Sequence, residues 1–364
     1  MTMQLLTEDK AIMSIRSFFR EIPFVFIGTG MSCAVDSRFG MEALRDALQV
    51  NKSLSDNSKT WTEEWQHVLD ALAKGIDLEN ALYYVNDQDL LKEIISITGK
   101  FISEIDREYA YLIAKDEVGW PAMGIIKKIY DTLPDSEPFL HILTPNYDML
   151  IEYACEQIGI TYSNGFWGGI SKSLDWNVVS LALHEAKKNV RGKSTKTVFY
   201  RKKHCLLYKV HGSLNYFFYR NAIVENNAWA WCPPEFAERV LITPGLTKYQ
   251  SLQQYRQELI QKPDSAIEKA VRFLFLGYGF NDSHLEVYIN RKLANQSCHG
   301  LIITRDSNSR IEDIVNTSSN LWLVCKPKDM KQGTRISNSQ FQDCIIPEKN
   351  FWNVQEFAVH ILGV

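Results

Sequence analysis

Asn146 and His211 are the side chains best suited to chemistry in this chain. Asn146 lies within residues 143–148 (LTPNYD) and His211 within residues 208–215 (YKVHGSLN), and each segment follows an apolar run that is typical of a β-strand. A carboxamide can hold water or a hydroxyl group in place, and an imidazole can accept a proton. The pair therefore suits a reaction at a sugar.

Two glycine-containing segments follow other strand-like runs. Where Cβ atoms are missing, a phosphate or a ribose can lie against the backbone, and the first turn of the next helix offers free N–H groups. The early segment, expected to approach a ligand phosphate, contains Gly28, Thr29, Gly30 and Ser32. The late segment, expected to hold an adenosine or ribose, contains Gly277, Gly279, Phe280, Asn281 and Asp282.

Each of these segments also has a purely structural explanation. Both glycine segments could be ordinary turns with helix caps, and Asn146 and Asp148 could cap the helix that follows them. His211 could be a satisfied structural residue, although Gly212 after it permits close approach of a ligand. Four such strand ends in order are more specific than any one alone, so we expect one shared site that also includes Asp148.

The elements around these segments predict an α/β fold. Strand-like runs occur at 24–27, 139–143, 205–210, 271–276, 301–304 and 321–325, and their continuous apolarity favours a parallel sheet buried on both faces. We expect a Rossmann-like parallel sheet with helices on both faces, an inserted helical subdomain and no zinc module. The expected division is a dinucleotide-binding domain (1–50 and 136–325), the helical subdomain (51–135) and a C-terminal extension (326–364).

Two further segments lie outside the expected strands of the sheet. Residues 61–133 carry helical periodicity, with one or two helices over 87–115 and another over 123–132. Residues 161–203 are rich in Gly, Ser and Trp, so we expect an irregular region with one short helix near 178–188.

Composition narrows the class of protein. The chain has 364 residues, 45% of them hydrophobic, and a net charge of −3, which argues against direct nucleic-acid binding by this chain alone. The basic stretch 187–203 is interpreted as a solvated loop rather than a phosphate contact. Seven scattered cysteines contain no Cys-x-x-Cys pair, so we expect reduced thiols, no metal and a cytoplasmic location. The apolar runs are too short to span a membrane.

The four segments together resemble the sirtuin family. Residues 28–32 (GTGMS) resemble its Gly-Ala-Gly-x-Ser nucleotide loop, 144–148 (TPNYD) its catalytic asparagine segment and 209–213 (KVHGS) its catalytic histidine segment. Residues 277–284 (GYGFNDSH) are similar to the late loop of the diverged bacterial branch. The resemblance implies an NAD site in which Asn146 holds the water or ribose and His211 is the general base.

The sequence departs from deacylase sirtuins in three places. It cannot build their four-cysteine zinc module, residues 35–40 (VDSRFG) replace their Ile-Pro-Asp-Phe-Arg, and Pro145 stands where they have Gln. The pattern is more similar to the bacterial sirtuin-type NAD hydrolases of antiphage defence. The chain is similar to short members of that branch, which resemble the partner of a HerA-type hexameric ATPase. Such a partner and its ATPase assemble into a large ring complex.

The resemblance therefore implies an NAD glycohydrolase. NAD would be the substrate, with its pyrophosphate held by backbone N–H groups near residues 28–32 and its adenosine side by residues 277–282. We expect a homo-oligomer, a HerA-type ATPase partner and activity that is restrained until assembly. One alternative is a non-catalytic NAD or ADP-ribose sensor or scaffold subunit. The other is a protein deacylase.

Overall fold

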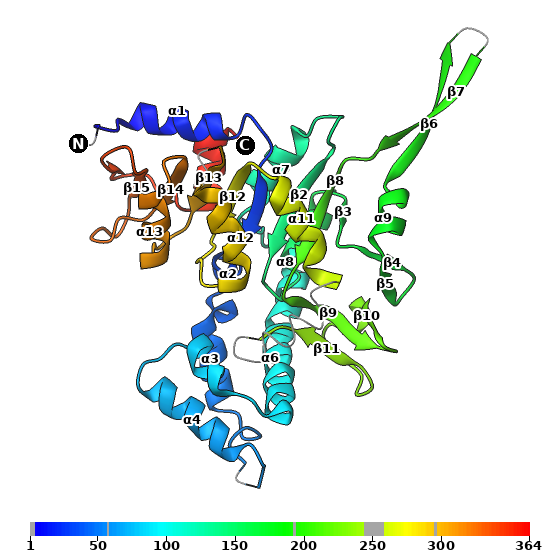
Figure 1. Cartoon of the computed structure of the whole chain (residues 1–364), viewed down its shortest axis with the longest axis vertical. Coiled ribbons are helices and arrows are strands. Elements are labelled where there is room, and N and C mark those ends of the chain that lie inside the picture. Colours follow the sequence, from blue (N-terminus) through cyan, green and yellow to red (C-terminus); the bar gives the residue numbers. More distant parts are fainter. Residues whose placement is uncertain (1–3, 57, 192–193, 244–257, 295–296) are drawn as a thin grey trace.

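A nine-stranded sheet forms the centre of the protein (Figure 1). The computed structural model describes residues 4–56, 58–191, 194–243, 258–294 and 297–364. Within these ranges the strand order is β16-β15-β14-β13-β12-β1-β2-β8-β3. The parallel strands are β1 (Phe24–Ile27), β2 (Phe139–Thr144), β3 (Tyr162–Ser163), β8 (His204–Lys209), β12 (Arg272–Leu276), β13 (His299–Ile303) and β14 (Leu321–Cys325). The antiparallel edge strands are β15 (Thr334–Ser337) and β16 (Cys344–Ile346).

Helices cover both faces of this sheet because its central strands are apolar on both sides. In β1 every residue is buried, with Val25 and Ile27 packed into one core and Phe24 and Phe26 into the other. Helices of the first core are α1 (Glu8–Phe18), α6 (Gln88–Ala114), α7 (Met123–Asp131) and α8 (Leu150–Gln157). Helices of the second core are α11 (Gln261–Lys269), α12 (Ser283–Leu293) and α13 (Ser309–Thr317). The predicted Rossmann-like fold is confirmed.

The segment between β1 and β2 is helical and has a small core of its own. It contains α2 (Thr29–Cys33), η1 (Ser37–Phe39), α3 (Met41–Gln49), α4 (Thr62–Ala73), α5 (Leu78–Ala81), η2 (Leu82–Tyr84), α6 and α7. Trp65, Leu48 and Leu90 lie in that core. Residues 88–114 form one helix, which begins after the Asp87 cap and reaches both this small core and the sheet. The proposed domain boundaries stay a prediction.

The segment after β3 differs from the prediction of an irregular region with a helix at 178–188. It forms the short helix α9 (Trp176–Ala182) and then a hairpin of β6 (His184–Arg191) and β7 (Ser194–Arg201) that projects from the body (Figure 1). The prediction was wrong because both strands consist mostly of polar residues, so neither shows the alternating apolar pattern of a half-buried strand.

A second, five-stranded antiparallel sheet lies beside the first, with the order β11-β9-β10-β5-β4. Its strands are β4 (Phe166–Gly168), β5 (Lys172–Leu174), β9 (Gly212–Tyr219), β10 (Ala222–Glu225) and β11 (Glu238–Leu241), with η3 (Asn227–Trp229) after β10. The chain ends in α14 (Val354–Phe357), which continues into the π-helical turn η4 (Ala358–Leu362). No helix in the described ranges is both long and apolar enough to cross a membrane.

Candidate active site

The four predicted segments meet at one cavity of about 310 Å³. They follow β12, β1, β2 and β8, which are neighbours in the sheet and run parallel, so that their carboxyl ends share one edge. The chain proceeds from β1 to one side of the sheet and returns at β12 on the other, which makes this edge a topological switch point. All the predicted site residues except Ser32 line the cavity: Gly28, Thr29, Gly30, Asn146, Asp148, His211, Gly277, Gly279, Phe280, Asn281 and Asp282.

Asn146 is held by the early glycine segment. Its Nδ2 donates to the Gly28 carbonyl at 3.1 Å and to Ser32 Oγ at 2.9 Å, and Ser32 Oγ donates to Asp148 Oδ2 at 2.7 Å. Both amide protons are therefore used inside the protein. Its Oδ1 has one long contact, 3.4 Å from Thr29 Oγ1, and a carbonyl oxygen has two lone pairs. Asn146 Oδ1 can therefore accept a hydrogen bond from a ligand in the cavity, whereas its amide protons are not available to donate one.

His211 is paired with Asp282 from the late segment. The distance from His211 Nε2 to Asp282 Oδ2 is 2.7 Å, and both side chains are nearly buried. Asp282 also caps α12, since its Oδ1 accepts from Leu285 N at 3.4 Å. A carboxylate on one ring nitrogen orients an imidazole and stabilises the imidazolium that forms when it takes a proton. The structure therefore brings together an imidazole and a carboxylate on the wall of the cavity.

Glycine is required at three of these positions by the packing of the two glycine segments against each other. A Cβ on Gly28 would lie 2.4 Å from the Gly277 carbonyl oxygen, and one on Gly30 would lie 2.8 Å from it. A Cβ on Gly277 would lie 2.8 Å from the Met31 nitrogen. The Gly30 N–H donates to that same oxygen at 3.0 Å, and the Met31 N–H donates to the Gly28 carbonyl at 3.0 Å. Two N–H groups expected to bind pyrophosphate are thus already hydrogen-bonded within the protein.

The late segment has a strained backbone. Phe280 is fully buried and has φ of 54°, which costs a residue with a Cβ about 1–2 kcal/mol. The carbonyl of Gly279 accepts from Asn308 Nδ2 at 2.7 Å, and that of Phe280 accepts from Arg310 Nη1 at 3.2 Å. These two side chains hold the segment in the shape that presents Asp282 to His211.

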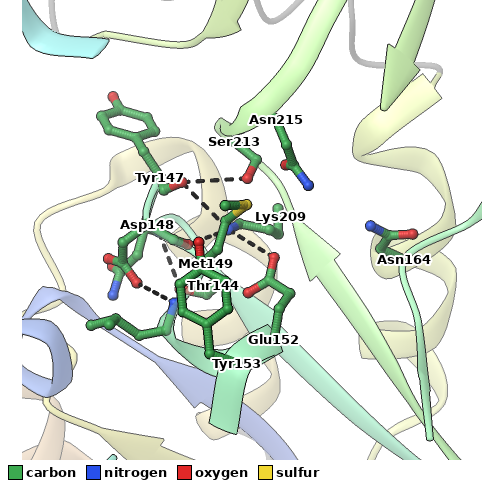
Figure 2. Close-up of polar contacts among 12 residues, drawn as sticks. Thr144, Tyr147, Asp148, Met149, Glu152, Tyr153, Asn164, Lys209, Ser213 and Asn215 are labelled. Atoms are coloured by element: carbon green, nitrogen blue, oxygen red, sulfur yellow. Dashed lines mark hydrogen bonds and ion pairs between the residues drawn. The ribbon is translucent and has the colours of Figure 1, made fainter. Parts of the chain in front are cut away.

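Lys209 supports the site from beneath, and sequence reasoning had assigned it no role. It is buried, and Figure 2 shows its ammonium among the carbonyl oxygens of Tyr147 and Asp148 and the carboxylate of Glu152, which is 3.1 Å away. Burial raises the pKa of Glu152 to about 7. A lysine at the end of a buried strand is the signal that could have identified this support, because buried ammonium groups need oxygen partners.

The helical segment supplies an apolar wall, which local sequence patterns had not placed at the site. Leu44 and Leu48 of α3 and Ile94 and Ile102 of α6 line the cavity, and Glu79 adds a carboxylate to those of Asp148 and Asp282. An apolar wall facing polar strand ends is the usual composition of a small-molecule site. The carboxylates favour a ligand, or a reacting centre, that is positively charged.

A known protein family matches the chain. A family model described as a SIR2-like domain matches residues 140–321, which are half of the chain. No curated protein matches it. Among the described residues, no group of three or more His, Cys, Asp or Glu side chains could hold a metal ion, and the seven cysteines are free.

Proposed function

Because the chain belongs to the SIR2-like domain family, whose members use NAD, we propose that it hydrolyses the bond between nicotinamide and ribose in NAD. The observation that carries this proposal is the position of Asn146 and the His211–Asp282 pair on the wall of one cavity. That cavity lies within the size range of ligand sites and has both an apolar and an acidic side.

The proposed reaction needs little covalent help from the protein. Nicotinamide leaves with the bonding electron pair, the anomeric carbon becomes positively charged, and water adds to it and loses a proton. Asn146 Oδ1 accepts a hydrogen bond from that water or from the ribose hydroxyls. His211 accepts a proton from a ribose hydroxyl, and Asp282 stabilises the imidazolium. The ribose oxygen then takes the proton that the added water loses, and the imidazolium releases its proton to the solvent. The acidic lining stabilises the positive charge that develops on the sugar.

Water is the proposed acceptor rather than an acylated lysine. The sequence lacks the deacylase features at residues 35–40 and at Pro145, and its cysteines are scattered along the chain. The resemblance to bacterial sirtuin-type NAD hydrolases supports a role in antiphage defence through NAD depletion. It also supports control of the activity by assembly into a homo-oligomer with a HerA-type ATPase.

An NAD-depletion assay tests this proposal. The purified chain, alone and with a HerA-type ATPase, is incubated with NAD, and released nicotinamide is measured by chromatography. Asn146→Ala and His211→Ala are each expected to lower the rate at least about a hundredfold. Matched controls are Asn290→Ala and His299→Ala, which change exposed side chains outside the cavity and should retain the wild-type rate.

Other outcomes separate the alternatives. If no condition releases nicotinamide and Asn146→Ala behaves as the wild type does, the hydrolase proposal is rejected. NAD binding by calorimetry without turnover would favour a sensor or scaffold subunit. Formation of O-acyl-ADP-ribose from an acylated peptide would favour a deacylase.

A further inference from the structure

The β6–β7 hairpin is an arm that packs little against the rest of the protein. We call residues 184–203 the arm. Its strands pair only with each other within the described residues, from His184 opposite Arg201 to Arg191 opposite Ser194, and it extends away from the body (Figure 1). A two-stranded hairpin without a packing partner is marginally stable in water. Binding to a partner would therefore stabilise an arm of this length.

The arm is strongly basic. It contains eight Lys and Arg residues and one Glu, a net charge of +7 in a chain whose net charge is −3. Lys187 lies opposite Val198 on one face and Lys188 lies opposite Thr197 on the other, so both faces are charged. Lysines on a strand edge also discourage aggregation, but charge of either sign would serve that purpose.

Exposed aromatic rings lie among these charges. Phe199 is 69% exposed and Tyr200 is 46% exposed, and the Lys187 ammonium lies 5.6 Å from the centre of the Tyr200 ring. Large apolar side chains that remain this exposed are typical of surfaces that bind another macromolecule. The arm therefore offers both charge and apolar area to a partner.

The opposite charge is found at the other end of the same molecule. We call residues 41–94 the helical lobe. It contains eleven Asp and Glu residues and five Lys and Arg residues, a net charge of −6. Several of its carboxylates are exposed, as are Met41, Val50 and Tyr83. Along the longest axis of the molecule, the lobe with α3 and α4 lies at one end and the arm at the other (Figure 1).

We propose that the arm of one copy binds the helical lobe of a second copy. The arm cannot reach the lobe of its own chain, because the two lie at opposite ends. A contact between two different surfaces of identical chains runs head to tail, and it closes into a ring when its rotation permits. Complementary charge aligns such a contact, and the exposed rings of the arm meet the apolar side chains of the lobe.

Charge reversal in the full-length chain tests this interface. The arm variant carries Lys187→Glu, Lys188→Glu and Lys196→Glu, and the lobe variant carries Glu42→Lys, Glu63→Lys and Asp70→Lys, all at exposed positions. Sedimentation velocity is expected to show association of the wild type that weakens with salt. Each variant alone should associate at least tenfold more weakly, because the three reversals lower the charge of the arm from +7 to +1, or raise the charge of the lobe from −6 to zero, and so remove the complementary charge.

A mixture of the two variants gives the decisive result. The unchanged lobe of the arm variant (−6) then meets the unchanged arm of the lobe variant (+7), so mixing should restore association as pairs of unlike variants. A control with Lys115→Glu, Lys128→Glu and Lys331→Glu has the same change in net charge outside the arm and should associate as the wild type does. A monomeric wild type, or a mixture that fails to associate, overturns the proposal. Duplex DNA binding that the arm variant loses, without any change in association, overturns it in favour of a nucleic-acid partner.

Discussion

His211 depends on another residue for its orientation. The Asp282 carboxylate, 2.7 Å from its Nε2, is supplied by a segment that also caps α12 and is held by Asn308 and Arg310. From sequence we expected Asp282 to contact the adenosine side of the ligand. Its position in the structure supports a role in positioning the base instead.

The substitution Asp282→Asn tests that role. Asparagine keeps the size of the side chain and its capacity to cap α12, but it removes the charge that stabilises the imidazolium. We expect kcat for NAD hydrolysis to fall about a hundredfold with little change in KM, and the thermal unfolding midpoint to stay near that of the wild type. The acidic limb of the pH–rate profile should move to lower pH. An unchanged kcat and pH profile would show that the carboxylate does not assist His211.

A substitution at Gly212, the residue after His211, tests how tightly the backbone of the site is packed. Its φ is 84°, and a Cβ would lie 1.9 Å from the Val240 carbonyl oxygen. Gly159 is a matched control, with φ of 69° and no atom within 4 Å of the same Cβ. In urea unfolding we expect Gly159→Ala to lose about 1 kcal/mol and Gly212→Ala about 3 kcal/mol, since only the latter adds a clash to backbone strain. Equal losses would show that the neighbouring strand moves aside at little cost.

At the scale of elements, the site is stabilised by contacts between strand ends. Lys209 at the end of β8 binds the carbonyls of Tyr147 and Asp148, which follow β2, and thereby joins the Asn146 segment to the His211 segment. Asp106 of α6 accepts from Met149 N at 2.7 Å and from the Tyr153 hydroxyl at 2.6 Å, and burial raises its pKa. The helical segment is therefore part of the support of the site as well as its apolar wall.

The packing of β2 makes the stability of the fold depend on pH. His141 stacks on Phe24 with ring centres 5.3 Å apart, and its Nδ1 lies 2.9 Å from the Tyr208 hydroxyl. Burial lowers its pKa to about 4, so its contribution is complete above the unfolded value of 6.5 and is lost as the pH falls toward 4. Between pH 7.5 and pH 5 we expect the wild type to lose about 2 kcal/mol more than His141→Phe in urea unfolding. Equal losses would mean that His141 is protonated freely in the fold.

At the scale of the whole molecule, charge is distributed unevenly. The arm has a net charge of +7 and the helical lobe one of −6, although the net charge of the whole chain is only −3. The lobe also supplies Leu44 and Leu48 to the cavity, so a second copy bound there would contact helices that form the wall of the site. The proposed self-association and the proposed control of NAD hydrolysis thus involve the same helices.

The sequence by itself determined the central parallel strands of the sheet and the place of the site, but not the edge strands β3, β15 and β16. The central strands appeared as continuous apolar runs because burial on both faces requires apolar residues at every position, which is a local pattern. The polar and glycine segments after those runs identified the residues of the cavity wall, because parallel strands bring their carboxyl ends to one edge. The polar hairpin β6–β7 showed no such pattern and was missed.

Only the tertiary structure decided which of these residues touch. The sheet order places β12 beside β1 and β8 beside β2, which brings Asp282 to His211 and Lys209 to the carbonyls of the Asn146 segment. It also packs Gly28 against Gly277, so that glycine is needed there for one loop to approach another. Such contacts depend on the order of the strands in the sheet, and the spacing of residues along the chain does not determine that order.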